Sequence, residues 1–253
     1  MAPIALADEI ELSHGSGKAI TLTCNDPELS TGPENLCIKA AEAYRAETGL
    51  DHGIAITLLK KIPHGAGLGG GSSDAASVLK GLNQLFDHPL VAEELAQIAA
   101  TLGSDVPFFL ENRPAWCRGR GEIIEPAPTL PARTLLLIKP AFPVPTAWAY
   151  KKYAEMKESG ELPTHADRQL LGDLEIINDL EIPVFDKYLL LPVIKKWLQE
   201  QPEVECAFMT GSGSTMVAVI KSDVSGEAMN KFKGVLSQQF SSTLWMTLTE
   251  FQF

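Results

Sequence analysis

Apolar and polar positions alternate in some parts of this chain and follow a helical spacing in others. Alternation around a glycine-rich turn over residues 8–24 predicts a β-hairpin, and alternation over 53–62 predicts a further strand. Between them, apolar residues fall at helical spacing from Leu36 to Tyr44, and Gly49 is a typical stop signal. The pattern therefore predicts a hairpin, a helix and a strand in this order.

A glycine-rich stretch follows, and beyond it the helical period returns. Apolar residues from Ala75 to Phe86 line one face of a predicted helix, and residues 90–103 predict a second helix closed by a glycine. Residues 104–110 lead into a predicted short strand, and residues 115–126 predict a pair of strands around a turn.

A proline-rich stretch then changes the composition of the chain. Residues 125–146 hold six prolines, and we place a domain boundary near Pro131, giving predicted domains 1–130 and 131–253. The second domain is predicted to contain strand Thr134–Ile138, helices at 147–158, 191–200 and 226–238, an apolar strand after the Gly/Ser turn in 209–220, and a final strand in 242–251. This mixture predicts an α+β protein with antiparallel strands and helices packed on them.

Charge and composition exclude several classes of protein. A net charge of −11 disfavours a general nucleic-acid binder, although a few backbone amides can still hold a small anion. No apolar run reaches the roughly 18 residues that span a bilayer, and the N-terminus lacks a secretory signal pattern. The four cysteines are scattered, which disfavours a zinc site or a disulfide framework. We expect a cytoplasmic protein with no membrane or nucleic-acid partner.

The candidate chemistry lies in the glycine-rich stretch, where six glycines occur within residues 65–81. A Walker P-loop is excluded because no lysine follows these glycines. Gly65, Gly67 and Gly70 do match GxGxxG, which would indicate a dehydrogenase that binds NAD or a flavin. That match alone is weak, because residues 60–64 separate it from the strand and a second helix follows where a strand is needed.

A third interpretation is a different phosphate cradle. Glycines let the backbone approach an anion, and Ser72 and Ser73 fall at a helix N-terminus with free N–H groups and a partial positive charge. The alternative is a tight turn in which Ser72 only caps the helix. The glycines outnumber what a cap requires, so phosphate binding is favoured.

Residues 62–76, IPHGAGLGGGSSDAA, resemble the second motif of the GHMP kinases, and similar stretches run over essentially the whole chain. They include PENLCIKAA, LGSDVPFFL, RGRGEIIEP, NDLE at 178–181 and MTGSGSTMVAV. The tripled glycine and the following aspartate resemble the branch that phosphorylates the 2-hydroxyl of 4-diphosphocytidyl-2-C-methyl-D-erythritol in non-mevalonate isoprenoid biosynthesis. The resemblance implies an α+β fold of two domains, the first ribosomal protein S5 domain 2-like and the second ferredoxin-like.

The resemblance also implies roles for single residues, with ATP as co-substrate and Mg²⁺ as cofactor. Asp105 matches the catalytic base, although its position alone favours a simple turn residue. Asn35 matches a position near the adenine, the alternative being a helix N-cap. The substrate side would include Gly211, Ser212 and Gly213. The ATP phosphates would lie against Pro63, Gly65, Ala66, Gly67, Leu68, Gly69, Gly70, Gly71, Ser72 and Ser73.

Three charged residues flank the loop. Asp74 is interpreted as a helix-dipole or structural contact, and a role near Mg²⁺ is left open. Lys60 and Lys61 are interpreted as solvated residues at the end of a strand, and an approach of one of them to the nucleotide is the alternative.

The sequence departs from the family at its beginning. Family members open with motifs like AKxNLxLxV and DGYH, which supply a catalytic lysine and part of the cytidine pocket, and this sequence contains neither. We expect an upstream segment that carries them, because the remaining motifs are intact. The alternative is an impaired, nucleotide-binding GHMP relative. A kinase for homoserine or mevalonate is disfavoured by SSDAA in place of SSAA. Without the first strand, a sheet edge or core face would be uncovered. We expect a monomer or weak homodimer.

Overall fold

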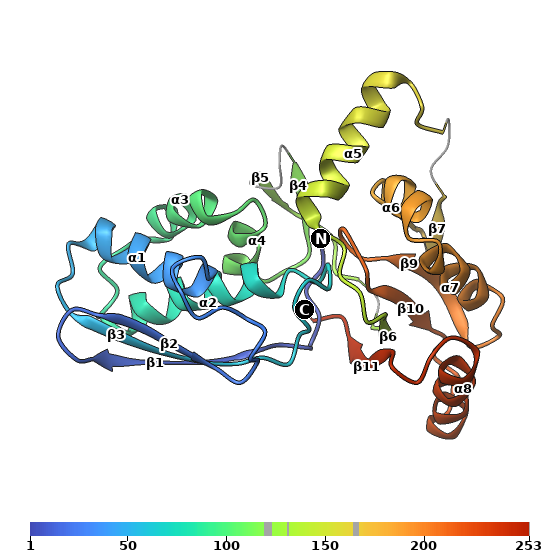
Figure 1. The fold of residues 1–253 in the computed structure, drawn as a ribbon, viewed down its shortest axis with the longest axis horizontal. Coiled ribbons are helices and arrows are strands. Elements are labelled where there is room, and N and C mark those ends of the chain that lie inside the picture. Colours follow the sequence, from blue (N-terminus) through green and yellow to red (C-terminus); the bar gives the residue numbers. More distant parts are fainter. Residues whose placement is uncertain (119–122, 131, 164–166, 253) are drawn as a thin grey trace. The chain divides into compact units, whose positions relative to one another are not determined.

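The computed structural model describes residues 1–118, 123–130, 132–163 and 167–252. The chain forms two compact units (Figure 1). The first contains Met1–His64, Gly69–Leu130 and Gln252–Phe253, and the second contains Gly65–Leu68 and Pro131–Phe251. The predicted boundary residue Pro131 lies outside the described residues.

A three-stranded sheet organises the first unit. Its strands are β1 (Glu9–Gly15), β2 (Ile20–Cys24) and β3 (Gly53–Leu59), in the order β1-β3-β2. β3 pairs antiparallel with β1 and parallel with β2, so the predicted hairpin over 8–24 is wrong although both of its strands exist. The apolar β3 lies at the centre of the sheet, and its inward side chains are therefore the most deeply buried. The edge strands β1 and β2 expose alternate residues.

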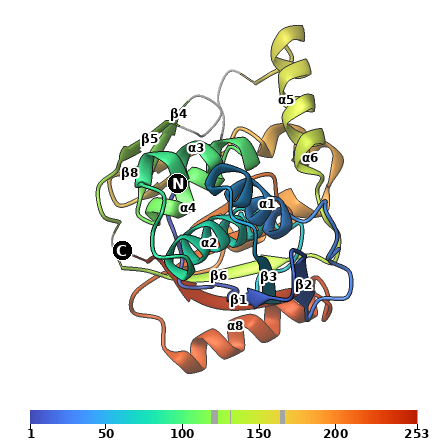
Figure 2. The same ribbon diagram turned by 90° about the vertical axis from the view of Figure 1, so that its left-hand side faces the viewer.

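Four helices complete the core of the first unit. α1 (Leu36–Thr48) and α2 (Gly70–Leu85) lie along one face of the sheet, and α3 (Ala92–Leu102) and α4 (Val106–Glu111) pack on these two helices (Figures 1 and 2). The predicted α1, β3, α2 and α3 are confirmed, including the left-handed stop of α1 at Gly49, with φ of 67°.

The segment after Asp105 is a helix, α4, so the strand predicted there is wrong. Its apolar run is too short for periodicity to separate a strand from a helix. Pro107 stands in the first turn, where the missing N–H costs nothing, and Phe108 is buried. β4 (Ala115–Arg118) and β5 (Ile123–Pro126) form the predicted antiparallel pair, and the turn between them lies outside the described residues.

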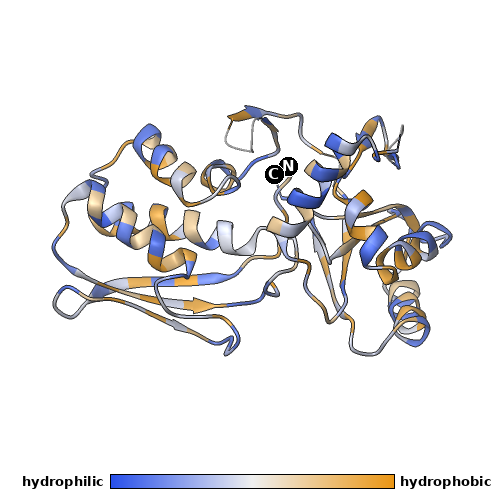
Figure 3. Ribbon diagram, turned by 45° about the horizontal axis from the view of Figure 1, so that its top comes forward, coloured by the Kyte–Doolittle hydropathy of each residue, from blue (hydrophilic) through white to orange (hydrophobic). Residues whose placement is uncertain are grey.

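The second unit is a four-stranded antiparallel sheet with helices. The strands β6 (Thr134–Lys139), β9 (Val204–Met209), β10 (Met216–Ile220) and β11 (Trp245–Glu250) have the order β11-β6-β10-β9. Numbered along the chain this order is fourth, first, third, second, which is the ferredoxin-like arrangement and confirms that prediction. Apolar residues follow the strands (Figure 3), and every residue of β10 is buried.

The helices of this unit are α5 (Thr146–Ser159), α6 (Glu181–Lys187), α7 (Leu190–Gln199) and α8 (Gly226–Gln239). The structure confirms the predicted α5, α7 and α8, and strands β6, β10 and β11. The sequence pattern missed β9, α6 and a short hairpin of β7 (Gln169–Leu171) and β8 (Leu174–Ile176). Among the described residues, no helix has the length and apolar character needed to cross a membrane.

Candidate active site

Helix α2 begins within the glycine-rich stretch and leaves backbone donors free. Gly69 is its N-cap, with φ of 70°, and the first helical hydrogen bond runs from Ser73 N to Gly69 O at 2.9 Å. The amides of Gly70, Gly71 and Ser72 therefore have no acceptor within the helix, and the helix dipole adds a partial positive charge there. This end of α2 suits an anion such as phosphate. Ser72 lies inside the first turn, so the alternative that it only caps the helix is wrong.

The first half of the loop, Gly65–Leu68, belongs to the second unit, where it lies against the turn between β9 and β10. Thr215 N donates to Ala66 O at 3.3 Å, and Thr210 Oγ1 donates to Gly67 O at the same distance. At Gly67, with φ of 72°, an added Cβ would lie 2.6 Å from two backbone oxygens of the turn. The structure thus brings Gly65–Leu68, the first half of the predicted phosphate loop, next to the turn that contains the predicted substrate-side residues Gly211, Ser212 and Gly213.

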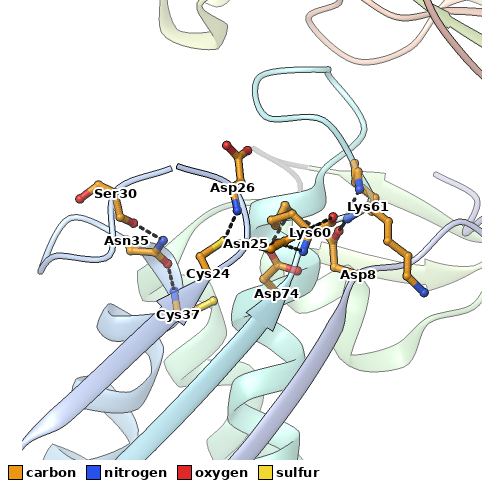
Figure 4. Close-up of polar contacts among 11 residues, drawn as sticks. Asp8, Cys24, Asn25, Asp26, Ser30, Asn35, Cys37, Lys60, Lys61 and Asp74 are labelled. Carbon is orange, nitrogen blue, oxygen red and sulfur yellow. Dashed lines mark hydrogen bonds and ion pairs between the residues drawn. The ribbon is translucent and has the colours of Figure 1, made fainter. Parts of the chain in front are cut away.

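The N-terminus of α1 lies close to that of α2 at the carboxyl ends of the parallel strands β2 and β3 (Figure 4). Asn35 caps α1 by accepting from Cys37 N at 2.9 Å, and its Nδ2 donates to Ser30 O at 2.7 Å. The capping alternative for Asn35 is confirmed, and its position near adenine stays a prediction. Ligands of α/β units commonly bind at the carboxyl ends of parallel strands, where such helix starts meet.

A buried charge cluster supports the start of α2 (Figure 4). Lys60 Nζ lies 2.5 Å from Asp8 Oδ2 and 2.8 Å from Asp74 Oδ2, and the three side chains are at most 7% exposed. Asp8 Oδ1 also accepts from the amides of Lys61 and Ile62. The structural contact predicted for Asp74 is confirmed, and the prediction of a solvated Lys60 is wrong. Lys61 is 46% exposed, as predicted.

The alternation of β3 contained the signal that would have placed Lys60. Ile54, Ile56 and Leu58 face the core, and two residues further the same parity reaches Lys60. The pairing of Glu9 with Leu59 then brings Asp8 opposite Lys60. That pairing joins strands far apart in the sequence, so the partner could not be predicted.

Two carboxylates share one ammonium in this cluster, so the ammonium cannot neutralise both of them. Burial raises the pKa of Asp74 to about 6, with Lys60 opposing the shift and Asp8 adding to it. Burial also works to lower the pKa of Lys60, but Asp74 and Asp8 outweigh it, so the pKa of Lys60 is raised. The cluster beneath the start of α2, the predicted phosphate site, therefore contains a carboxylate with a pKa raised to about 6.

Asp105 stands at the start of α4 with a half-buried side chain. Within the described ranges its carboxylate has no hydrogen bond or ion pair, and it does not cap α4. Burial raises the pKa of Asp105, which makes it a stronger base than an exposed aspartate. A half-buried carboxylate to which the described residues offer no hydrogen bond can accept a proton.

Strand β1 lies at one edge of the three-stranded sheet. Among the described residues no strand pairs with the outer side of β1. A groove of about 650 Å³ lies between β1 and α2, lined by Asp8, Ile10, Leu12, Ser77, Gly81, Gln84 and Leu85.

Comparisons with known proteins place the chain in a family. Residues 35–113 match the family described as GHMP kinases N terminal domain. A 4-diphosphocytidyl-2-C-methyl-D-erythritol kinase of Methylacidiphilum infernorum is 44% identical over 224 residues, which cover 88% of this chain and 77% of the relative. The chain belongs to the 4-diphosphocytidyl-2-C-methyl-D-erythritol kinase family. Another member of this family, from Geobacter metallireducens, is 36% identical over 88% of this chain and 80% of its own.

Solved structures agree with membership of this kinase family. A crystal structure of 4-(cytidine 5'-diphospho)-2C-methyl-D-erythritol kinase is 30% identical, with a TM-score of 0.71, and is similar over 100% of this chain and 89% of its own. The L. major mevalonate kinase has the same TM-score at 15% identity and shares the fold alone, over 99% of this chain and 88% of its own. The expected α+β GHMP kinase fold is confirmed, and membership of the family excludes the dehydrogenase interpretation.

Proposed function

We propose that this chain is an ATP-dependent kinase that phosphorylates the 2-hydroxyl of 4-diphosphocytidyl-2-C-methyl-D-erythritol, giving the 2-phosphate and ADP in non-mevalonate isoprenoid biosynthesis. The observation that carries the proposal is the glycine-rich start of α2, with its free amides, in a chain 44% identical to a kinase of that name. Phosphoryl transfer depends on positioning and on charge neutralisation, and this site offers both.

The ATP phosphates would lie against the amides of Gly70, Gly71 and Ser72, and Asn35 would lie near the adenine. The hydroxyls of Ser72 and Ser73 are hard oxygen donors and fit Mg²⁺, which would neutralise phosphate charge. Gly211, Ser212 and Gly213 would border the acceptor.

Asp105 would accept the proton of the 2-hydroxyl as its oxygen attacks the γ-phosphorus. The raised pKa of Asp105 favours proton transfer to its carboxylate, and no hydrogen bond or ion pair from the described residues occupies its oxygens. We further propose that the protein acts in the cytoplasm as a monomer or weak homodimer, with functional domains 1–130 and 131–253.

The test is ADP release from Mg-ATP with 4-diphosphocytidyl-2-C-methyl-D-erythritol as acceptor. The chain is measured beside a form preceded by a segment that carries the AKxNLxLxV motif, with homoserine and mevalonate as competing acceptors. Activity in either form with the diphosphocytidyl acceptor supports the proposal. ATP binding without turnover in both forms would indicate a non-catalytic relative, and preference for another acceptor would indicate another GHMP kinase.

Asp105→Ala tests the base directly. Turnover in the active form should fall by at least about 100-fold, while the Kd for Mg-ATP stays within about twofold, because the base acts on the acceptor's proton. Asp51→Ala, which removes an exposed carboxylate paired with Lys18, is the matched control and should change neither quantity. Equal losses of turnover and ATP affinity in Asp105→Ala would refute its role as base.

A further inference from the structure

The NDLE motif, residues 178–181, holds the turn between β9 and β10. Asn178 Nδ2 donates to Met209 O at 2.7 Å and to Gly211 O at 2.8 Å, so one amide group grips the carbonyls on both sides of Thr210. Asn178 Oδ1 accepts from Leu180 N at 3.1 Å. Both the donor and the acceptor atoms of this side chain are therefore used, and its orientation is fixed from both ends.

Glu181 binds the backbone N–H of Met209, at the end of β9, whereas Asn178 binds its C=O. Its Oε1 accepts from Met209 N at 2.8 Å, and its Oε2 accepts from Lys195 Nζ at 2.5 Å. Glu181 and Lys195 are buried, at 5% and 4% exposure. The N–H and C=O of Met209 are thus both bound by side chains of one motif, and Lys195 of α7 pairs with the buried carboxylate of Glu181.

The turn held in this way interlocks with the glycine loop. An added Cβ on Gly211 would lie 2.7 Å from Gly67 O, and one on Gly67 would lie 2.6 Å from Thr210 O. Thr210 Oγ1 also donates to Gly67 O. The backbones touch at van der Waals distance, so a displacement of the turn must displace Gly65–Leu68.

We infer that Asn178, Glu181 and Lys195 are positioning residues that set the path of Gly65–Leu68 for the ATP phosphates. The part that concerns ATP rests on the proposed function, whereas the mechanical link between motif, turn and loop stands on the contacts alone. A misplacement of about 1 Å in a phosphoryl-transfer site can lower the rate about 100-fold, so a fixed loop path matters for catalysis.

The first test removes the hydrogen bonds that the Asn178 side chain donates to Met209 O and Gly211 O. Asn178→Ala should weaken Mg-ATP binding about tenfold and speed hydrogen exchange in the peptides that cover residues 63–73 and 208–215. Asn230→Ala, an exposed asparagine on α8, is the matched control and should change neither quantity. Both measurements are made at least about 20 °C below each variant's melting temperature, so that a loss of stability alone does not register.

Two double variants separate positioning from stability. The two double variants are Glu181→Gln/Lys195→Met and Glu181→Met/Lys195→Met. Both remove the buried charges with side chains of similar length, but only the glutamine retains an oxygen that can accept the hydrogen bond from Met209 N. The glutamine pair should bind Mg-ATP within about twofold of the unaltered chain. The methionine pair should bind about tenfold more weakly and exchange faster at residues 63–73.

The outcomes distinguish this inference from the proposed function. Equal ATP affinity and equal exchange in the two double variants, or an Asn178→Ala variant that matches Asn230→Ala, would overturn the inference. Failure of the unaltered chain to bind ATP would count against the proposed function. The exchange result would then still confirm or overturn the mechanical link, because it needs no ligand.

Discussion

Each unit contains a lysine whose ammonium lies between two carboxylates, but these two lysines have different surroundings. Lys60 in the first unit lies between Asp8 and Asp74, whose side chains are 2% and 5% exposed. Lys195 in the second unit also lies between two carboxylates, but only Glu181 is buried, and Asp167 is 54% exposed. The surplus carboxylate therefore remains in contact with water in the second unit and is sealed from it in the first.

This difference in exposure is reflected in the pKa values of the carboxylates in the two clusters. Burial raises the pKa of Asp74 to about 6 in spite of Lys60. Burial also acts to raise the pKa of Asp167, but Lys195 outweighs it and the pKa of Asp167 is lowered. Burial raises the pKa of Glu181 as well, against Lys195 and the amide of Met209. Asp74, whose pKa is raised to about 6, lies on α2, whose N-terminus is the proposed phosphate site.

The largest effect is expected from removing each lysine. Lys60→Met should destabilise the first unit by about 3–5 kcal/mol, because two buried carboxylates lose the ammonium that pairs with both of them. Lys195→Met should lower the stability of the second unit by less. The exposed carboxylate of Asp167 can be hydrated by water, and Glu181 retains its hydrogen bond from Met209 N. Urea titration followed by hydrogen exchange, which resolves the two units, measures both losses. The contrast between the clusters would be wrong if Lys195→Met were the more damaging change.

A rescue experiment sharpens this result. Adding Asp8→Asn and Asp74→Asn to Lys60→Met should restore more than half of the lost stability, because neutral amides replace the unpaired charges. Absence of rescue would mean that the loss comes from packing of the lysine stem and not from charge.

A smaller effect, of opposite sign in the two clusters, is expected with pH. The pKa of Asp74 rises from 3.8 to about 6 on folding, so the folded state binds this proton more tightly than the unfolded state. The resulting stabilisation is complete below pH 3.8 and is lost as pH rises through about 6. The shift corresponds to about 3 kcal/mol. Asp74→Asn should therefore stabilise the first unit at pH 7 and not at pH 4.

Asp167→Asn is the matched control for this titration. The pKa of Asp167 is lowered on folding, so its contribution is present above its ordinary pKa of 3.8 and is lost as pH falls below that value. Asp167→Asn should destabilise the second unit at pH 7, the reverse of Asp74→Asn. Free energies of unfolding of each unit between pH 4 and 7.5 check both signs, and a shared sign would contradict the comparison.

The two clusters also show how far the sequence could lead. Period-two alternation predicts β3 and, continued for two residues, the inward position of Lys60. The proximity of its partner Asp8 can be predicted only from the pairing of β1 with β3. The sequence pattern instead predicted that β1 pairs with the next strand in a hairpin. Local periodicity reports which side of an element faces the core and carries no information on which distant element covers it.

The same limit applies to the candidate site. The glycine-rich start of α2 could be predicted because glycine content and helix starts are local signals. The contact of Gly67 with the turn at 210–215 could not, because it joins segments more than 140 residues apart. The grip of Asn178 on Met209 is also long-range, at 31 residues, and no local pattern indicates it.

The smallest predicted effect tests how rigid the first cluster is. An added Cβ on Gly70 would lie 3.1 Å from Ile62 Cγ2 and 3.3 Å from Lys60 Nζ, whereas one on Gly71 would meet only Leu36 Cδ1 at 3.5 Å. Gly71→Ala should therefore stabilise the first unit by about 0.5 kcal/mol through the unfolded state. Gly70→Ala should instead destabilise it by about 1 kcal/mol, because an ammonium held by two carboxylates cannot yield.

A double-mutant cycle shows whether that penalty comes from Lys60. In a Lys60→Met/Asp8→Asn/Asp74→Asn background the side chain at position 60 is no longer fixed by ion pairs, so Gly70→Ala should cost about 0.5 kcal/mol less than in the unaltered chain. Urea unfolding of the four proteins gives the coupling energy. A coupling of zero would place the strain at Ile62 and leave the lysine cluster without influence on the start of α2, whereas the expected coupling ties the buried charge directly to the backbone that is proposed to hold phosphate.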